Sequence, residues 1–101
     1  MRKPILTALF LLTTLLSLAQ KGRIEGRVYN QKNNKPLEFA TIQIQGTQIG
    51  SNSDLDGKFI FTGIEPGFVR LIVSYVGFET TVSAEIQVQG NQTAFIDIAV
   101  P

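Results

Sequence analysis

Asp54 and Asp56 are the residues whose type and spacing come closest to a chemical site, in the run Asp54-Leu55-Asp56-Gly57. The pattern resembles part of a calcium-binding loop. A complete calcium site needs about six to eight oxygen ligands, usually including a bidentate glutamate further along the chain. No glutamate stands where an EF-hand would place it. We therefore predict a turn and no metal site, with aspartate side chains accepting turn amides and Gly57 at a positive φ.

The absence of two residue types restricts catalysis. The chain has no histidine and no cysteine, which excludes zinc sites and the Ser-His and Cys-His nucleophiles. A glycosidase would need two carboxylates facing across a cleft. Asp54, Asp56 and Glu65 fall in predicted turns, and so small a domain leaves little room for a cleft. We predict no catalytic residues, no cofactor and no enzymatic activity.

The aromatic residues suggest two different roles. Several are spaced as core residues, and we expect them in the core rather than in a sugar-stacking platform, because a small domain without disulfides needs their bulk there. These residues are Phe59, Phe61, Phe68, Tyr75 and Phe78. Phe39 and Phe95 instead lie opposite the aliphatic residues of their own strands. We therefore predict that these two form an apolar patch that docks a partner.

The elements that position these residues are predicted to be strands. No helical period appears after residue 20, whereas alternation of apolar and polar residues recurs, which is typical of strands with one buried face. In residues 38–45, for example, Ala40, Ile42 and Ile44 share one face. The alternating segments are residues 23–29, 38–45, 58–62, 78–88 and 93–100. Residues 78–88 are long for a single strand, so we expect a break near Ser83-Ala84.

The remaining segments are predicted from composition. Residues 68–78 are apolar on both faces, which indicates a central strand covered on both sides. Residues 30–36 are predicted to form a loop, and residues 46–57 are predicted to cross between the sheets with little regular structure. Pro66-Gly67 predicts a type II turn. Six or seven short strands with turns at regular intervals are typical of a β-sandwich.

The N-terminus has the pattern of a signal peptide. Arg2 and Lys3 precede an apolar run over residues 5–16, and Ser17-Leu18-Ala19 supplies the small residues of a cleavage site. The run is shorter than the roughly 20 residues that span a bilayer, and no cysteine is present for lipid attachment. We predict a cleaved signal peptide over residues 1–19 and a mature domain over residues 20–101.

The charge of the mature domain gives no sign of a polyanionic partner. Removing the leader takes two of the nine Lys and Arg residues and none of the eight Asp and Glu residues, which leaves 7 − 8 = −1. The charges are not clustered, so we expect neither nucleic acid nor direct insertion into a membrane. Without cysteine, no disulfide stabilises the fold, and apolar burial must do so alone.

The mature chain resembles the carboxypeptidase-regulatory-like, or transthyretin-like, domains found at the N-terminus of TonB-dependent outer-membrane receptors of Bacteroidota. Order and spacing of the matching residues carry the resemblance. They are Gly26-x-Val28, Pro36-Leu37-x-x-Ala40-Thr41-Ile42, Gly46-Thr47-x-x-Gly50, Ser53-Asp54-x-Asp56-Gly57-x-Phe59, Pro66-Gly67 and Ser74-Tyr75-Val76-Gly77-Phe78.

This resemblance implies a seven-stranded, Greek-key-like β-sandwich in the periplasm, at the inner face of the outer membrane, with no catalytic residues. It also implies contacts with protein components of an outer-membrane nutrient-uptake system. The family's plug and barrel do not follow Pro101, so the chain is expected to be either a fragment of a larger receptor or a free-standing copy. Two alternatives stay open: a free-standing carbohydrate- or peptide-binding module, and a structural spacer. The ligand, the partner and the oligomeric state are not specified by the sequence.

Overall fold

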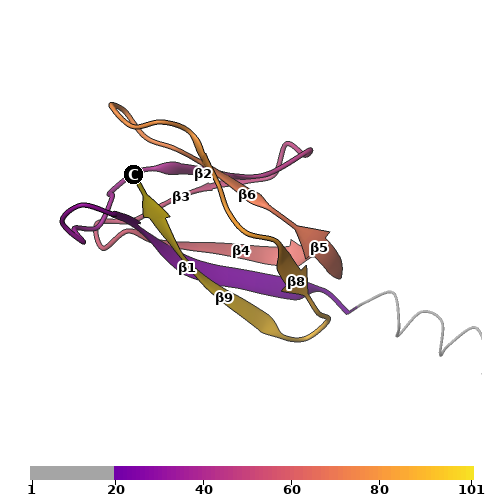
Figure 1. The fold of residues 1–101 in the computed structure, drawn as a ribbon. Coiled ribbons are helices and arrows are strands. Elements are labelled where there is room, and N and C mark those ends of the chain that lie inside the picture. Colours follow the sequence, from indigo (N-terminus) through magenta and orange to yellow (C-terminus); the bar gives the residue numbers. More distant parts are fainter. Residues whose placement is uncertain (1–19) are drawn as a thin grey trace, which may run out of the picture.

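The computed structural model describes residues 20–101, and every regular element in that range is a β-strand (Figure 1). The predicted signal peptide, residues 1–19, lies outside the described residues. No helix in residues 20–101 is long and apolar enough to cross a bilayer. The strands are β1 (Gly22–Asn30), β2 (Thr41–Ile44), β3 (Gly50–Asn52), β4 (Lys58–Ile64), β5 (Gly67–Val69), β6 (Leu71–Ser74), β7 (Thr81–Val82), β8 (Ile86–Val88) and β9 (Thr93–Val100).

The strands form two facing layers, which confirms the predicted all-β sandwich (Figure 1). One layer has the order β4-β1-β9 and the other β3-β2-β6-β7, while β5 and β8 pair with each other at one end. β1 is antiparallel to β4 and parallel to β9. The described residues form nine strand segments where the sequence predicts six or seven, because residues 68–78 and 78–88 each divide into two segments and the predicted crossing contains β3.

The core lies between the two layers and follows the predicted alternation. Ile24 and Val28 of β1 and Ile42 of β2 belong to the same core cluster, and all three are fully buried. The Phe59 and Phe61 rings of β4 are also buried, as predicted, and meet edge to face with centroids 6.0 Å apart. Each large apolar side chain buried in this way contributes about 1.5 to 3 kcal/mol. This layer of apolar contacts is the main source of stability, since no disulfide is present.

Two predicted boundaries in the first half of the chain are wrong. The crossing over residues 46–57 contains β3, which pairs antiparallel with β2. β2 itself begins at Thr41 rather than at Glu38, because Phe39 has a φ of 60° and a residue in that conformation cannot continue a strand. The apolar face of the predicted strand is nevertheless confirmed, since Ala40, Ile42 and Ile44 are all buried.

The predicted central strand over residues 68–78 is divided. Its middle becomes β6, which lies between β2 and β7 with Leu71 and Val73 buried. Its beginning becomes β5, which leaves the main layers to pair with β8, so that Phe68 is 66 % exposed and its predicted core position is wrong. Its end is a turn in which Tyr75 and Phe78 pack against the rim of the core.

Ser83 marks the predicted break in residues 78–88. Its hydroxyl accepts from the Leu71 amide at 2.9 Å and donates to the Ala84 carbonyl at 2.8 Å. Its own amide donates to the Leu71 carbonyl at 2.8 Å. The break separates β7 from β8 and allows them to join different sheets.

Candidate functional site

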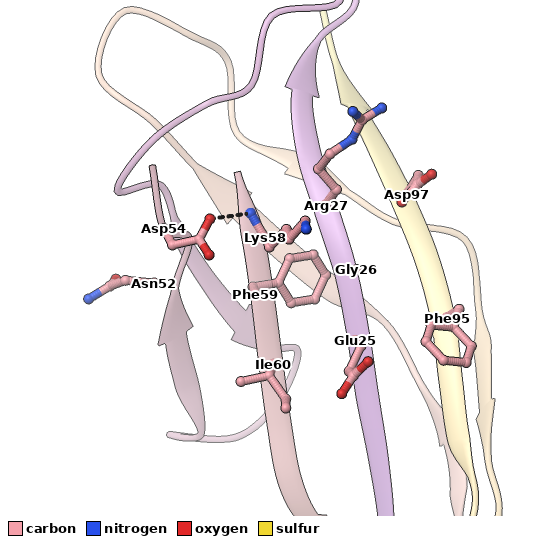
Figure 2. Close-up of a pocket in the computed structure, with 10 residues that line it drawn as sticks. All are labelled: Glu25, Gly26, Arg27, Asn52, Asp54, Lys58, Phe59, Ile60, Phe95 and Asp97. Carbon is pink, nitrogen blue, oxygen red and sulfur yellow. Dashed lines mark hydrogen bonds between the residues drawn. The ribbon is translucent and has the colours of Figure 1, made fainter. Parts of the chain in front are cut away.

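The Asp54 turn is a structural cap, as predicted. One carboxylate oxygen, Oδ1, accepts the amides of both Asp56 and Lys58 at 2.9 Å. Figure 2 shows the bond from Lys58. Gly57 has a φ of 75°, and its carbonyl accepts from the Val28 amide of the neighbouring strand. The turn therefore attaches the start of β4 to β1. No group of three or more His, Cys, Asp or Glu side chains within residues 20–101 is arranged to hold a metal.

Calcium is expected to have no effect on thermal stability. The Asp54 oxygen that would bind the ion already accepts two amides, and Asp56 supplies the one other carboxylate of the turn. The melting temperature in excess calcium should equal that in EDTA. A rise of several degrees with calcium would contradict the assignment, because an ion bound to the native state alone stabilises it by mass action.

Phe39 lies in an open hollow on the outer side of the β3-β2-β6-β7 layer. The ring is 66 % exposed. The other lining residues come from the start of β2 and from the turn after β6: Glu38, Thr41, Ser74, Tyr75, Val76, Phe78 and Thr80. Val76 is 92 % exposed. The hollow therefore gathers apolar groups from two segments about 35 residues apart in the sequence, an arrangement that alternation within one strand does not predict.

Ser53 holds the Phe39 backbone in place. The Phe39 amide donates to the Ser53 carbonyl at 3.0 Å, and the Ala40 amide donates to the Ser53 hydroxyl at 2.8 Å. That hydroxyl in turn donates to the Leu37 carbonyl at 2.6 Å. Ser53 is 2 % exposed, so these bonds form in the protein interior. They fix a left-handed φ at a bulky aromatic residue, a conformation that costs about 1 to 2 kcal/mol.

Phe95 lies in a separate open hollow, on the outer face of the β4-β1-β9 layer (Figure 2). The register places Ile60, Glu25 and Phe95 side by side across the three strands. The next row consists of Lys58, Arg27 and Asp97. The Phe95 ring is 77 % exposed, and Ile60 is exposed as well. This face is therefore part apolar and part charged.

The structure does not bring the two predicted docking residues together. Phe39 and Phe95 line different hollows, and these lie on the outer sides of opposite layers. The predicted single patch is therefore two surfaces. The sequence identified one aromatic residue of each surface, Phe39 and Phe95. It did not identify Ile60, because the strand over residues 58–62 was predicted from its buried face alone. It missed Val76 because the run 68–78 was expected to be covered on both faces.

Charged side chains near these surfaces make few ion pairs within residues 20–101. The Lys21 ammonium lies 2.6 Å from the Glu65 carboxylate and holds the pKa of that carboxyl below its ordinary value, mainly through the hydrogen bond. The Arg23 guanidinium bonds Glu25 at 2.9 Å. The Arg27 guanidinium lies over the Tyr29 ring, 5.1 Å from its centroid. All of these groups are at least partly exposed, so their effect on stability is small.

The fold and its turns define the class of this protein: a β-sandwich domain without disulfides, whose strands are joined by short capped turns. Residues 24–101 match the CarboxypepD_reg-like domain, and the chain belongs to this family. The resemblance drawn from the sequence motifs is therefore confirmed. No curated protein matches the chain at the level of sequence.

Several solved structures share the fold at low sequence identity. The Bacillus anthracis TIE protein superposes with a TM-score of 0.67 at 13 % identity, over 80 % of this chain and 16 % of its own. BcpA, the major pilin subunit of Bacillus cereus, gives 0.62 at 17 %, over 80 % and 30 %. A DUF3823 family protein from Bacteroides ovatus gives 0.56 at 18 %, over 79 % and 44 %. This chain therefore spans less than half the length of each of these structures.

Proposed function

We propose that this domain is a non-enzymatic accessory module that mediates protein contacts in a TonB-dependent outer-membrane nutrient-uptake system. It acts in the periplasm, at the inner face of the outer membrane. Membership of the CarboxypepD_reg-like family supports an accessory role. The resemblance of the sequence motifs to the N-terminal domains of such receptors supports this cellular context.

Phe39 is the observation that carries the protein-contact part of the proposal. Its ring is 66 % exposed, and its backbone is held at a φ of 60° by buried hydrogen bonds to Ser53. Isolated exposed apolar side chains are common and often have no role. An exposed ring whose placement also costs backbone strain is different, since glycine or asparagine would occupy this position at lower cost. A docking role accounts for both the exposure and the strain.

Replacing Phe39 or Phe95 with serine, each alone, is expected to weaken co-purification with outer-membrane components while leaving thermal stability nearly unchanged. Both rings are largely exposed, so little buried area is lost from the folded domain. The measurement is affinity capture of the tagged protein from its native host, with melting curves of each variant. Single variants are needed because the rings lie on opposite layers and can contact different partners.

Phe68→Ser is the matched control, because Phe68 is also 66 % exposed but lies on β5, outside both hollows. It should co-purify as the wild type does. If it loses components to the same extent as the other two, general surface hydrophobicity explains the capture and the docking proposal is wrong. A loss of several kcal/mol in stability from Phe39→Ser or Phe95→Ser would instead mean that the ring is buried, as for large-to-small core substitutions.

A further inference from the structure

β9 is an edge strand with one unpaired side. It pairs with β1 alone among residues 20–101, and it lies at the end of the β4-β1-β9 layer (Figure 1). The pairing is parallel and continuous over all eight residues, from Thr93 opposite Arg23 to Val100 opposite Asn30. An edge strand presents a row of free amide and carbonyl groups that can pair with another chain.

The hydrogen bonds to β1 fix which backbone groups are free. The Arg23 amide donates to the Gln92 carbonyl, and the Gln31 amide donates to the Val100 carbonyl, each at 3.0 Å. In a parallel ladder of this register, the even-numbered residues of β9 therefore bond to β1. The odd-numbered residues Thr93, Phe95, Asp97 and Ala99 direct their amides and carbonyls to the opposite, free side. Their side chains lie on the outer face, where Phe95 and Asp97 border the hollow of Figure 2.

The other edges of the sandwich carry protective features that β9 lacks. β3 and β7 are edge strands of only three and two residues. β4 begins with Lys58, and it contains Gly63 at a φ of 65°, which makes the strand locally irregular. Short strands, lysines and local irregularities all prevent accidental pairing. β9 has eight residues, five of which are β-branched or aromatic, with no proline, no glycine, and Asp97 as its one charge.

Side chains at this edge define the chemistry of an occupant. Side chains of an added strand alternate between faces, so residues two apart would lie beside Phe95 and Asp97. The Phe95 ring is 77 % exposed and offers an apolar contact. The Asp97 carboxylate makes no ion pair within residues 20–101 even though Arg27 is its register partner, because the Arg27 guanidinium lies over Tyr29. An apolar residue and a cation two positions apart would complement this edge.

We propose that the free edge of β9 binds an extended segment of a partner protein as an added strand, with an apolar residue beside Phe95 and a lysine or arginine beside Asp97. Main-chain hydrogen bonds from the odd-numbered residues supply most of the affinity, and the two side chains supply selectivity. This inference rests on the proposed function as a protein-contact module and names the chemistry of the segment that it binds.

The test separates the backbone contribution from the charge. Ala99→Pro removes an amide on the free side and leaves the ladder to β1 intact, because proline is tolerated on the solvent side of an edge strand. Ala99→Ser is the matched control that keeps the amide. Asp97→Asn removes only the charge. The probe is a short, end-blocked threonine peptide that carries valine and lysine two positions apart, and the measurement is an NMR titration of the protein's backbone amides.

The expected result is a set of shifts concentrated on the amides of Thr93, Phe95, Asp97 and Ala99. Ala99→Pro should weaken binding by about tenfold, since one main-chain hydrogen bond is lost and a ring is added at the interface. Ala99→Ser should bind as the wild type does. Asp97→Asn should reduce the preference for the lysine peptide over one with glutamate in its place. Shifts centred elsewhere, or equal binding by a folded Ala99→Pro variant, would overturn the inference.

A second measurement covers the case in which Ala99→Pro is unfolded. The same peptide methylated on every backbone nitrogen has no amide left to donate on either edge and cannot form the ladder. The wild-type protein should therefore not bind it, and binding at full strength would again overturn the inference. Co-purification distinguishes this result from the proposed function. If Phe39→Ser loses outer-membrane components and Ala99→Pro retains them and binds peptide normally, the accessory role stands and the added strand is wrong.

Discussion

Gly26→Val is expected to destabilise the domain by at least about 3 kcal/mol, at the upper end of the range for overpacked core positions. Gly26 lies at the centre of β1, opposite Phe59 of β4 and Ile96 of β9. A Cβ atom added there would overlap the Ile96 carbonyl oxygen and lie 2.8 Å from the Phe59 ring. The carbonyl belongs to the backbone and cannot rotate away, so the layer β4-β1-β9 must separate or the Phe59 ring must leave the core.

Chemical denaturation measured by circular dichroism will test this expectation. Gly50→Val is the matched control, because Gly50 also lies in a strand but a Cβ there would meet only the Ile42 carbonyl, at an ordinary 3.5 Å. We expect that control to change stability by less than about 1 kcal/mol, as surface substitutions usually do. If the two variants have the same midpoint, the close approach of the three strands at Gly26 is not a determinant of stability.

Ser53→Ala is expected to cost about 2 to 3 kcal/mol, because it leaves the Ala40 amide and the Leu37 carbonyl without the hydroxyl that now bonds both. The site is buried, so water does not readily replace the lost partner. In a domain of this size, such a loss lowers the melting temperature by about 10 °C or more. Differential scanning calorimetry is the measurement. Ser51→Ala, two residues earlier and partly exposed, should have little effect.

Ser53→Ala also tests how Phe39 is positioned. Without the hydroxyl, the segment from Leu37 to Ala40 loses two of its bonds to Ser53, and the strained φ of Phe39 can relax. Capture of outer-membrane components through the Phe39 surface should therefore weaken even at temperatures where the variant is folded. Full capture by a folded Ser53→Ala variant would show that the fixed backbone conformation of Phe39 does not matter for docking.

Together, the two proposals assign different contacts to opposite sides of the sandwich. Phe39 and Val76 offer an apolar surface beside the β3-β2-β6-β7 layer. The free edge of β9 offers main-chain hydrogen bonds beside the β4-β1-β9 layer. A domain with two such surfaces can join two components of an assembly, which is consistent with an accessory role and requires no catalytic chemistry.

Much of the buried face of each strand could be predicted from the sequence, because alternation is a local property of the chain. Ile42 and Ile44 are buried, and so are Phe59 and Phe61, as their spacing indicates. The Asp54 turn was predictable for the same reason, since its carboxylate bonds amides only two and four residues away. The number of short strands and the regular spacing of the turns predicted the sandwich, and the family motifs implied the same architecture.

Other features depend on contacts between distant segments. Phe68 is a large apolar residue in an apolar run, which is typical of the core. However, β5 leaves the main layers to pair with β8, and this pairing exposes the ring. The exposure of Phe39 was predictable, whereas its strained φ depends on Ser53, which is 14 residues further along the chain. The grouping of Phe39 with Val76, and its separation from Phe95, likewise follows from how the layers pack.

The sequence by itself therefore determined the all-β class, the apolar faces, the capped turns and the absence of imidazole and thiolate chemistry, because each of these depends on residue type and short-range spacing. Only the tertiary structure decided that β9 has an open edge, that Gly26 lies in close contact with both neighbouring strands, and that Phe39 and Phe95 lie on separate surfaces. Those properties arise when strands far apart in the chain become neighbours, and the parallel pairing of β1 with β9 joins residues 70 positions apart.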